Sequence, residues 1–136
     1  PPPPPPPRLD SSAASDVYKR QIINIASILG VGVSKGLASY IAAKSAVINL
    51  TKAMALEWTR NNIRVNAIAP GYFVTEINEA AFEQGAHEMV RQAVPMGRVG
   101  EMAEISGPLL LLASDAGGYM TGSVITVDGG HLVRSL

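Results

Sequence analysis

Tyr40 and Lys44 are the two side chains whose types and spacing most directly suggest chemistry. Residues at positions i and i+4 of a helix lie on one face, so the phenol and the ammonium would be neighbours. A nearby cation favours the phenolate form of a tyrosine, which makes the side chain usable as a proton donor and acceptor for an alcohol or carbonyl oxygen. The alternative interpretation is a solvent-facing pair without a catalytic role, because one such spacing also arises by chance.

The elements that must position this pair follow from the hydrophobic pattern. Short runs of β-branched and small apolar residues predict buried strands, and segments with apolar residues every three or four positions predict helices. The predicted strands are residues 22–26, 63–69 and 123–127, and the predicted helices are residues 39–61, 76–94 and 101–114. Helices that connect apolar strands imply parallel pairing with right-handed crossovers. The expected fold class is therefore α/β, as half of a doubly wound parallel sheet.

Small or polar residues stand at the carboxyl end of each predicted strand. Ser27 follows the first strand, Pro70-Gly71 follow the second, and Asp128 closes the third. Thr75 is expected to cap a helix that begins at Glu76, with its amino-terminal N–H groups facing the same edge. Because the carboxyl ends of parallel strands meet at one edge of a sheet, the sequence predicts a single ligand crevice there.

The predicted helix at 39–61 is apolar over more of its circumference than one buried stripe requires. The stripe expected to face the core consists of Ala43, Val47, Leu50, Met54 and Trp58. Further apolar positions that indicate a second face include Ala42, Ile48 and Met54. We expect this second face to pack against another subunit.

Composition excludes several classes of function. The 136 residues are 47% hydrophobic and 16% charged, which is typical of one globular domain. Eleven Lys and Arg balance 11 Asp and Glu, which argues against a nucleic-acid binder or a membrane-surface protein. The chain has no cysteine, and His87 and His131 lie too far apart for metal-ligand spacing, so no metal site is expected. No apolar run approaches the roughly 18 residues of a membrane span. We expect a cytoplasmic protein.

The first 21 residues differ in composition from the rest. Residues 1–7 are an uninterrupted proline run, which is typical of a polyproline ligand or of a disordered tail. Residues 16–21 read as the in-frame translation of a transposase tag used to prepare sequencing libraries, and a run of C would read as consecutive prolines. We therefore interpret residues 1–21 as an adapter-derived disordered segment and residues 22–136 as a truncated domain whose reading frame continued upstream.

Several short motifs occur in an order and spacing typical of one family. They are Asn24-Ile25-Ala26-Ser27, Tyr40-xxx-Lys44, Val65-Asn66-Ala67-Ile68-Ala69-Pro70-Gly71, Thr75, Pro95-Met96-Gly97-Arg98, Tyr119-Met120-Thr121-Gly122 and Val127-Asp128-Gly129-Gly130. Together they resemble the carboxyl-terminal half of the classical short-chain dehydrogenases/reductases, over essentially all of residues 22–136. The resemblance implies half of a Rossmann-type sheet and an enzyme that uses NAD or NADP to move a hydride between nicotinamide and a secondary alcohol or ketone. The pattern is most similar to 3-oxoacyl-carrier-protein reductases and to sugar or polyol dehydrogenases.

The resemblance also implies roles for the catalytic residues. Tyr40 would be the acid and base, Lys44 would favour its phenolate and hold the nicotinamide ribose, and Ser27 would orient the substrate oxygen. The implied partners are a small alcohol or carbonyl substrate and, in the full-length parent, further copies in a dimer or tetramer.

A second set of residues is implied to bind the nicotinamide. Pro70-Gly71 would let the backbone approach the ring, and the segment through Phe73 and Thr75 would hold the carboxamide. Phe73 departs from the smaller branched residue usual in the family, and Met102 replaces a proline often found after the Gly-Arg-x-Gly turn. Arg98 is left with two interpretations, stabilising a carboxylate or capping a turn.

The family's Gly-rich phosphate loop, its Asn-Ala-Gly segment and its assisting asparagine belong upstream of Ile22. Residues 30–36 look like a phosphate loop, but they lie between Ser27 and Tyr40, where the family places substrate-side residues. We expect a substrate loop there. Two other interpretations of the chain stay open: a fragment without activity, and a proline-rich interaction protein without catalysis.

Overall fold

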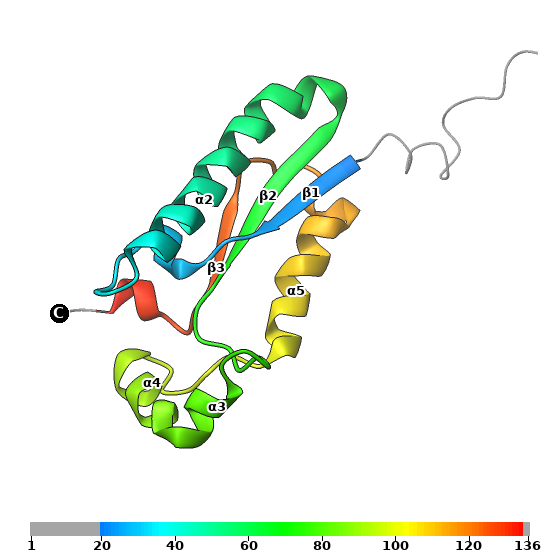
Figure 1. Ribbon diagram of the computed structural model, residues 1–136. Coiled ribbons are helices and arrows are strands. Elements are labelled where there is room, and N and C mark those ends of the chain that lie inside the picture. The colour runs from blue at the N-terminus through cyan, green and yellow to red at the C-terminus, as the bar shows by residue number, and fades with distance from the viewer. Residues whose placement is uncertain (1–19, 135–136) are drawn as a thin grey trace, which may run out of the picture.

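The protein is described here by a computed structural model that covers residues 20–134. Three strands, β1 (Arg20–Ile25), β2 (Ile63–Pro70) and β3 (Val124–Val127), form a parallel sheet in the order β1-β2-β3. Helix α2 (Ala38–Trp58) covers one face of this sheet, and helix α5 (Met102–Ala113) covers the other (Figure 1). The predicted α/β class with parallel pairing is therefore confirmed.

Strand β1 begins two residues earlier than its apolar run predicts. Arg20 pairs with Ile63, and Gln21 pairs with Arg64 in the parallel register. The Gln21 amide oxygen also accepts a hydrogen bond of 2.8 Å from the Arg64 guanidinium. Arg20 and Gln21, which belong to the segment interpreted as adapter-derived, thus take part in the sheet. The other residues of that segment, 1–19, lie outside the described part of the chain.

The core lies between β2 and α2, and the stripe of α2 that faces it only partly matches the predicted one: Val47 packs against the core as predicted. The buried residues of α2 are Ile48, Thr51 and Ala55, whereas Leu50 of the predicted stripe is 55% exposed and Ala43 is exposed as well. Ile48 therefore belongs to the core and not to a second face. The rotation of α2 is set by a close approach at Gly30, where a β-carbon would lie 2.7 Å from Ile48 Cδ1.

Strand β3 is tied to β2 by a buried amide for which the sequence pattern predicts no role. Asn66 is fully buried; its Oδ1 accepts from the backbone N–H of Ser123 at 3.0 Å, and its Nδ2 donates to the carbonyl of Met120 at 2.8 Å. Thr121 Oγ1 accepts from the N–H of Val65 at 3.1 Å. These bonds satisfy polar groups that would otherwise be buried without partners, and they fix the start of β3.

The predicted helix at 76–94 is wrong at its start and is interrupted within. It forms as α3 (Glu79–Ala81), a π-helical turn η3 (Phe82–Ala86) and α4 (His87–Ala93), with Gly85 at φ +107° in the interruption. No helix begins at Glu76, because residues 76–78 form a turn: the Thr75 carbonyl accepts from the N–H of Glu79 at 2.9 Å, and the Thr75 N–H donates to Asn78 Oδ1 at 2.7 Å. Asn78 Nδ2 in turn donates to the carbonyl of Phe73 at 2.8 Å, so a closed turn occupies the place of the first helical turn.

Helix α5 lies within one residue of its predicted bounds at each end. Glu101 is its N-cap, and the side chain of Glu104 accepts from the Glu101 N–H at 2.8 Å to complete a capping box. Leu112 is fully buried as predicted, but Leu109 of the same predicted stripe is 40% exposed. None of the helices in the described part of the chain combines the length and apolar character that a bilayer span requires.

Candidate active site

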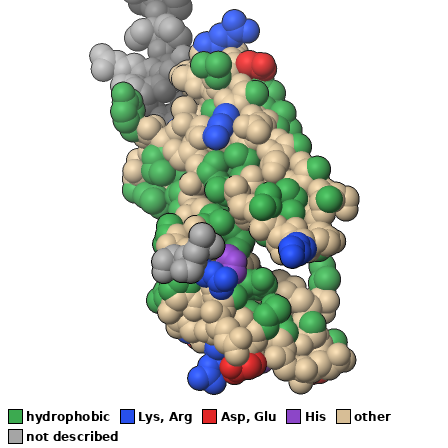
Figure 2. Space-filling model, turned by 90° about the vertical axis from the view of Figure 1, so that its left-hand side faces the viewer, with side chains coloured by type: hydrophobic (Ala, Val, Ile, Leu, Met, Phe, Trp, Pro, Cys, Tyr) green, Lys and Arg blue, Asp and Glu red, His purple; other side chains and the backbone are tan. Residues whose placement is uncertain are grey.

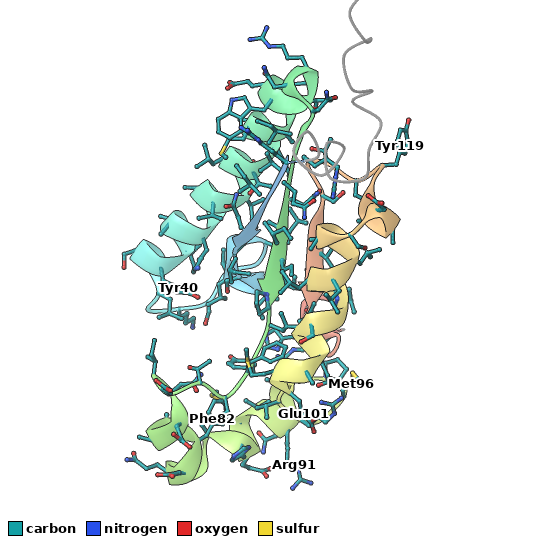
Figure 3. All side chains as sticks on the ribbon, turned by 90° about the vertical axis from the view of Figure 1, so that its right-hand side faces the viewer. Tyr40, Phe82, Arg91, Met96, Glu101 and Tyr119 are labelled. Carbon is teal, nitrogen blue, oxygen red and sulfur yellow. The ribbon has the colours of Figure 1, made fainter. Side chains whose placement is uncertain are left out.

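Tyr40 and Lys44 lie on the first turns of α2, at the end of the helix that faces the α3–α4 region (Figure 3). The Lys44 ammonium is 5.8 Å from the centre of the Tyr40 ring, so the two side chains are neighbours as their spacing predicts. Lys44 Nζ also donates a hydrogen bond of 3.0 Å to the carbonyl of Ile25, the last residue of β1. This bond uses one of three ammonium protons and holds the cation at the carboxyl end of the sheet. Tyr40 is 44% exposed and open to a ligand.

Ser27 lies just beyond β1, where the chain turns into the 3-10 helix η1 (Ile28–Gly30). Its side chain is the N-cap of η1: Oγ accepts from the N–H of Leu29 at 3.1 Å. Ser27 is only 7% exposed, which restricts its hydroxyl to a defined orientation. The bond to Leu29 uses the oxygen as an acceptor, and the hydroxyl proton is left as a donor.

Gly71 brings the end of β2 against the end of β3. Its N–H donates to the carbonyl of Val127 at 2.9 Å, and a β-carbon at this position would lie 2.8 Å from the Cα of Asp128. The Asp128 carboxylate accepts from the N–H groups of Gly130 and Leu132, each at 2.9 Å. Asp128 therefore shapes the turn after β3, and only a residue without a side chain fits beside it at Gly71.

Phe73 and Thr75 occupy the loop that follows Gly71. The Phe73 ring is 7% exposed and lies directly over Gly100, where a β-carbon would overlap it. The absence of a side chain at Gly100 explains how the fold accepts a residue larger than the family usually has at this position. Thr75 is exposed, and its backbone is held by the Asn78 side chain.

Arg98 forms a two-pronged ion pair with Glu104. Its Nη1 lies 2.8 Å from Glu104 Oε2, and its Nη2 lies 2.7 Å from Oε1. The hydrogen bond from Arg98, followed by the Glu101 N–H, lowers the pKa of Glu104 to about 2, and the carboxylate raises the pKa of Arg98 in return. Of the two interpretations of Arg98, the structure agrees with a carboxylate partner, which is the side chain of Glu104. A hollow of about 100 Å³ separates this pair from the strand ends.

His131 is a polar residue of this region for which the sequence pattern predicts no role. It lies in the 3-10 helix η5 (His131–Val133), and its ring meets Tyr72 edge-on with centroids 5.5 Å apart. Its Nδ1 is buried without a hydrogen-bond partner within residues 20–134. The only sequence signal for it is its place after the third strand. The same described residues hold no cluster of three acidic or histidine side chains fit for a metal ion.

The predicted site residues thus converge at one edge of the sheet. Lys44 contacts the end of β1, Ser27 follows that strand, and Gly71 joins the ends of β2 and β3. This is the edge at which open parallel sheets bind ligands. An open parallel sheet with polar side chains at this edge places the chain in the class of ligand-binding α/β domains.

Comparisons with known proteins agree with this class. A family model described as enoyl-(acyl carrier protein) reductase matches residues 12–131. A 3-oxoacyl-[acyl-carrier-protein] reductase of Thermotoga maritima is 41% identical over 112 residues, which are 82% of this chain and 45% of the relative. A 2-dehydro-3-deoxy-D-gluconate 5-dehydrogenase of Escherichia coli is 45% identical over 116 residues, which are 84% of this chain and 46% of the relative. The chain belongs to the short-chain dehydrogenase/reductase family.

Solved structures give the same result for the fold. A gluconate 5-dehydrogenase from Burkholderia cenocepacia, in complex with NADP and tartrate, superposes with a TM-score of 0.80 at 38% identity and covers 85% of this chain and 46% of that one. A 4-hydroxyisoleucine dehydrogenase complexed with NADH superposes with a TM-score of 0.82 at 34% identity, covering 90% of this chain and 53% of that one. The chain spans about half the length of the relatives it matches.

Proposed function

We propose that the parent protein of this chain is an NAD(P)-dependent oxidoreductase that moves a hydride between nicotinamide and the carbon of a secondary alcohol or ketone. The observation that carries the proposal is the Tyr40–Lys44 pair, held by the carbonyl of Ile25 at the carboxyl end of β1, two residues before Ser27. Family membership and the NADP and NADH complexes of similar structures support it.

The donor set fits a nicotinamide nucleotide. Lys44 keeps two ammonium protons after its bond to Ile25, which suit the hydroxyl oxygens of a ribose. Residues 71–75 follow β2 at the same edge of the sheet, where the N–H groups of Gly71 and Thr75 are used by Val127 and Asn78, so a nucleotide would use the other backbone groups of this segment. The bound nucleotide would supply or accept the hydride.

The chain's own residues would handle the proton. During reduction, Tyr40 Oη gives its proton to the carbonyl oxygen as the carbon gains the hydride, and during oxidation the phenolate takes the proton back from the alcohol. Lys44 is the cation beside this tyrosine, with its ammonium 5.8 Å from the ring centre. The Ser27 hydroxyl donates a hydrogen bond to the same substrate oxygen and thereby orients the carbonyl for hydride attack.

The side chains around the site favour an oxoacyl substrate over a polyol. Val31 and Val33 of the loop before α2 are 58% and 85% exposed, and Val133 of η5 is 85% exposed. The two segments meet at Gly32, where a β-carbon would lie 2.9 Å from Leu132 Cδ2. A polyol needs several hydrogen-bonding side chains, whereas an acyl chain gains from apolar contact.

The proposal is tested by nicotinamide oxidation with the full-length parent, offered a 3-oxoacyl thioester, a keto sugar acid and a simple cyclic ketone. We expect turnover of the thioester in preference to the sugar acid, and loss of that turnover in Ser27→Ala. A parent that binds NADH or NADPH but reduces none of the three carbonyls would overturn the proposal. The alternative that the chain is an inactive fragment concerns the 136 residues expressed alone. The alternative of a proline-rich interaction protein rests on residues 1–7, which lie outside the described part of the chain.

We also propose that the parent is a cytoplasmic homo-oligomer, dimer or tetramer. Figure 2 shows hydrophobic side chains in several separate patches over the side of the molecule that faces the viewer, with single charged side chains between them. Leu50 and Leu56 of α2 are 55% and 84% exposed, and exposed apolar patches of this kind typically mark subunit contacts. Use of a dissociable nicotinamide nucleotide favours the cytoplasm.

A further inference from the structure

One segment, residues 94–100, contacts the loops at the ends of both β2 and β3. The N–H of Met96 donates to the carbonyl of Gly129 at 3.1 Å, after β3. The N–H of Gly100 donates to the carbonyl of Tyr72 at 2.8 Å, after β2, and Gly100 forms a parallel bridge with Phe73. The position of this segment therefore fixes the distance between the two loops.

The contacts leave little room for the segment to shift by itself. Gly129 has φ +63°, and a β-carbon there would lie 2.7 Å from Val94 Cγ1. The ring of Phe73 fills the space over Gly100. A displacement of residues 94–100 must therefore move Phe73, and with it the backbone of residues 71–75.

Arg98 and Glu104 are the side chains that hold this segment against α5. The two oxygens of Glu104 face the two terminal nitrogens of Arg98, at 2.7 and 2.8 Å. Glu104 Oε2 also accepts from the Glu101 N–H, which anchors the carboxylate to the first turn of α5. Arg98 Nη1 further donates to the carbonyl of Val99 at 3.0 Å. A planar fork of this kind fixes orientation as well as distance.

We propose that Arg98 and Glu104 are positioning residues that set the place of the nicotinamide-binding loop at residues 71–75. They act through Gly100 and Phe73, not by contact with the nucleotide. This inference rests on the proposed function, because it assigns residues 71–75 to the nucleotide site. Loss of the fork should weaken nucleotide binding and leave the proton-transfer groups at Tyr40 and Ser27 in place.

The test compares Arg98→Lys and Glu104→Gln with the wild-type full-length parent. We expect the KM for the nucleotide to rise about threefold in Glu104→Gln, a modest change because the two side chains are 46% and 41% exposed, while kcat stays unchanged, since uniform binding is lost without loss of transition-state contacts. Arg98→Lys keeps the charge but loses the fork, so its KM should also rise. The charge-swapped double variant Arg98→Glu with Glu104→Arg should recover part of the affinity.

Glu88→Gln is the matched control. Glu88 forms an exposed ion pair with Arg91 at 3.9 Å, and its loss should change neither parameter. Unchanged nucleotide KM in both Arg98→Lys and Glu104→Gln would overturn the inference, even if their melting temperatures fell. If Glu104→Gln does not fold, Arg98→Lys and the swapped variant decide the matter. A wild-type parent without hydride transfer would instead contradict the proposed function.

Discussion

The ammonium of Lys44 lies 5.8 Å from the centre of the Tyr40 ring and is held there by the carbonyl of Ile25. Two residues one helical turn apart are thereby fixed to the end of a strand that belongs to another part of the sequence. This contact uses one of the three ammonium protons and leaves two for a ligand such as a ribose.

The first prediction concerns this pair in the full-length parent. Tyr40→Phe should abolish turnover and leave nucleotide binding nearly intact, because only the ionisable hydroxyl is removed. Lys44→Met should reduce both turnover and nucleotide affinity, because it serves the phenolate and the ribose. Steady-state kinetics with nucleotide titrations checks both. A near wild-type rate in Tyr40→Phe would show that another group transfers the proton.

The sequence predicted the strands well because their β-branched runs are short and bounded by Ser27 and Pro70-Gly71. It misjudged which face of α2 is buried, because alanines and larger apolar residues occur around most of this helix, and the contact at Gly30 that selects the face is not visible in a periodicity. The helix start at Glu76 failed for a similar reason, since the Asn78 side chain closes the preceding turn.

The candidate site, like the fold, could be predicted only in part from the sequence. Tyr40 and Lys44 are found from spacing alone because i and i+4 are adjacent on any helix. The Arg98–Glu104 fork spans six positions across a loop and a helix start, a separation with no periodic signature. The edge-on contact of Tyr72 with His131 joins the ends of two strands and requires the folded sheet.

The second prediction uses the close approach of Gly71 to Asp128. Gly71→Ala places a β-carbon 2.8 Å from Asp128 Cα, so we expect a loss of about 1–3 kcal/mol in the free energy of unfolding. Gly107→Ala is the control, because Gly107 lies within α5 and a β-carbon there meets nothing within 4 Å. Since Pro108 follows and disfavours a β-carbon at the preceding helical position, the usual gain of about 0.5–1 kcal/mol for Gly→Ala is offset, and the net change should be close to zero. Urea unfolding of the parent measures both, and equal effects would refute the steric argument.

The third prediction concerns pH. The pKa of Glu104 is lowered to about 2, chiefly by the hydrogen bond from Arg98. A carboxyl whose folded pKa is depressed contributes stability that is present above its unfolded value of 4.5 and is lost as the pH falls through its folded value. The urea midpoint of the wild type should therefore exceed that of Glu104→Gln at neutral pH and approach it between about pH 4.5 and pH 2.

Salt provides an independent check of the same pair. The side chains of Arg98 and Glu104 are 46% and 41% exposed, so the difference between wild type and Glu104→Gln should be small and should shrink in added salt. A difference that grows as the pH falls would contradict the assigned sign.

The fourth prediction concerns the exposed side of α2. Leu50 is 55% exposed although the sequence pattern placed it in the core. Leu50→Asp should leave the fold of the subunit intact and shift the parent to a smaller species in light scattering at micromolar concentration. Lys52→Asp, a change at an already polar exposed position, is the control. A wild-type parent that is monomeric under these conditions would contradict the proposed oligomer.

The fifth prediction concerns the 136-residue chain expressed alone. Within the described residues, β1 pairs with β2 only, so its other edge offers unpaired N–H and C=O groups beside Ile25, which is 51% exposed. Leu110 of α5, the helix on the sheet face opposite α2, is 65% exposed. The motifs recognised in this chain supply the Tyr–Lys pair but no Gly-rich loop with backbone donors for a pyrophosphate. We therefore expect poor solubility and no saturable binding of NADH or NADPH.

Nucleotide fluorescence titration tests this fifth prediction, with the full-length parent as positive control. A soluble monomer that binds either nucleotide at micromolar concentration would disprove the prediction.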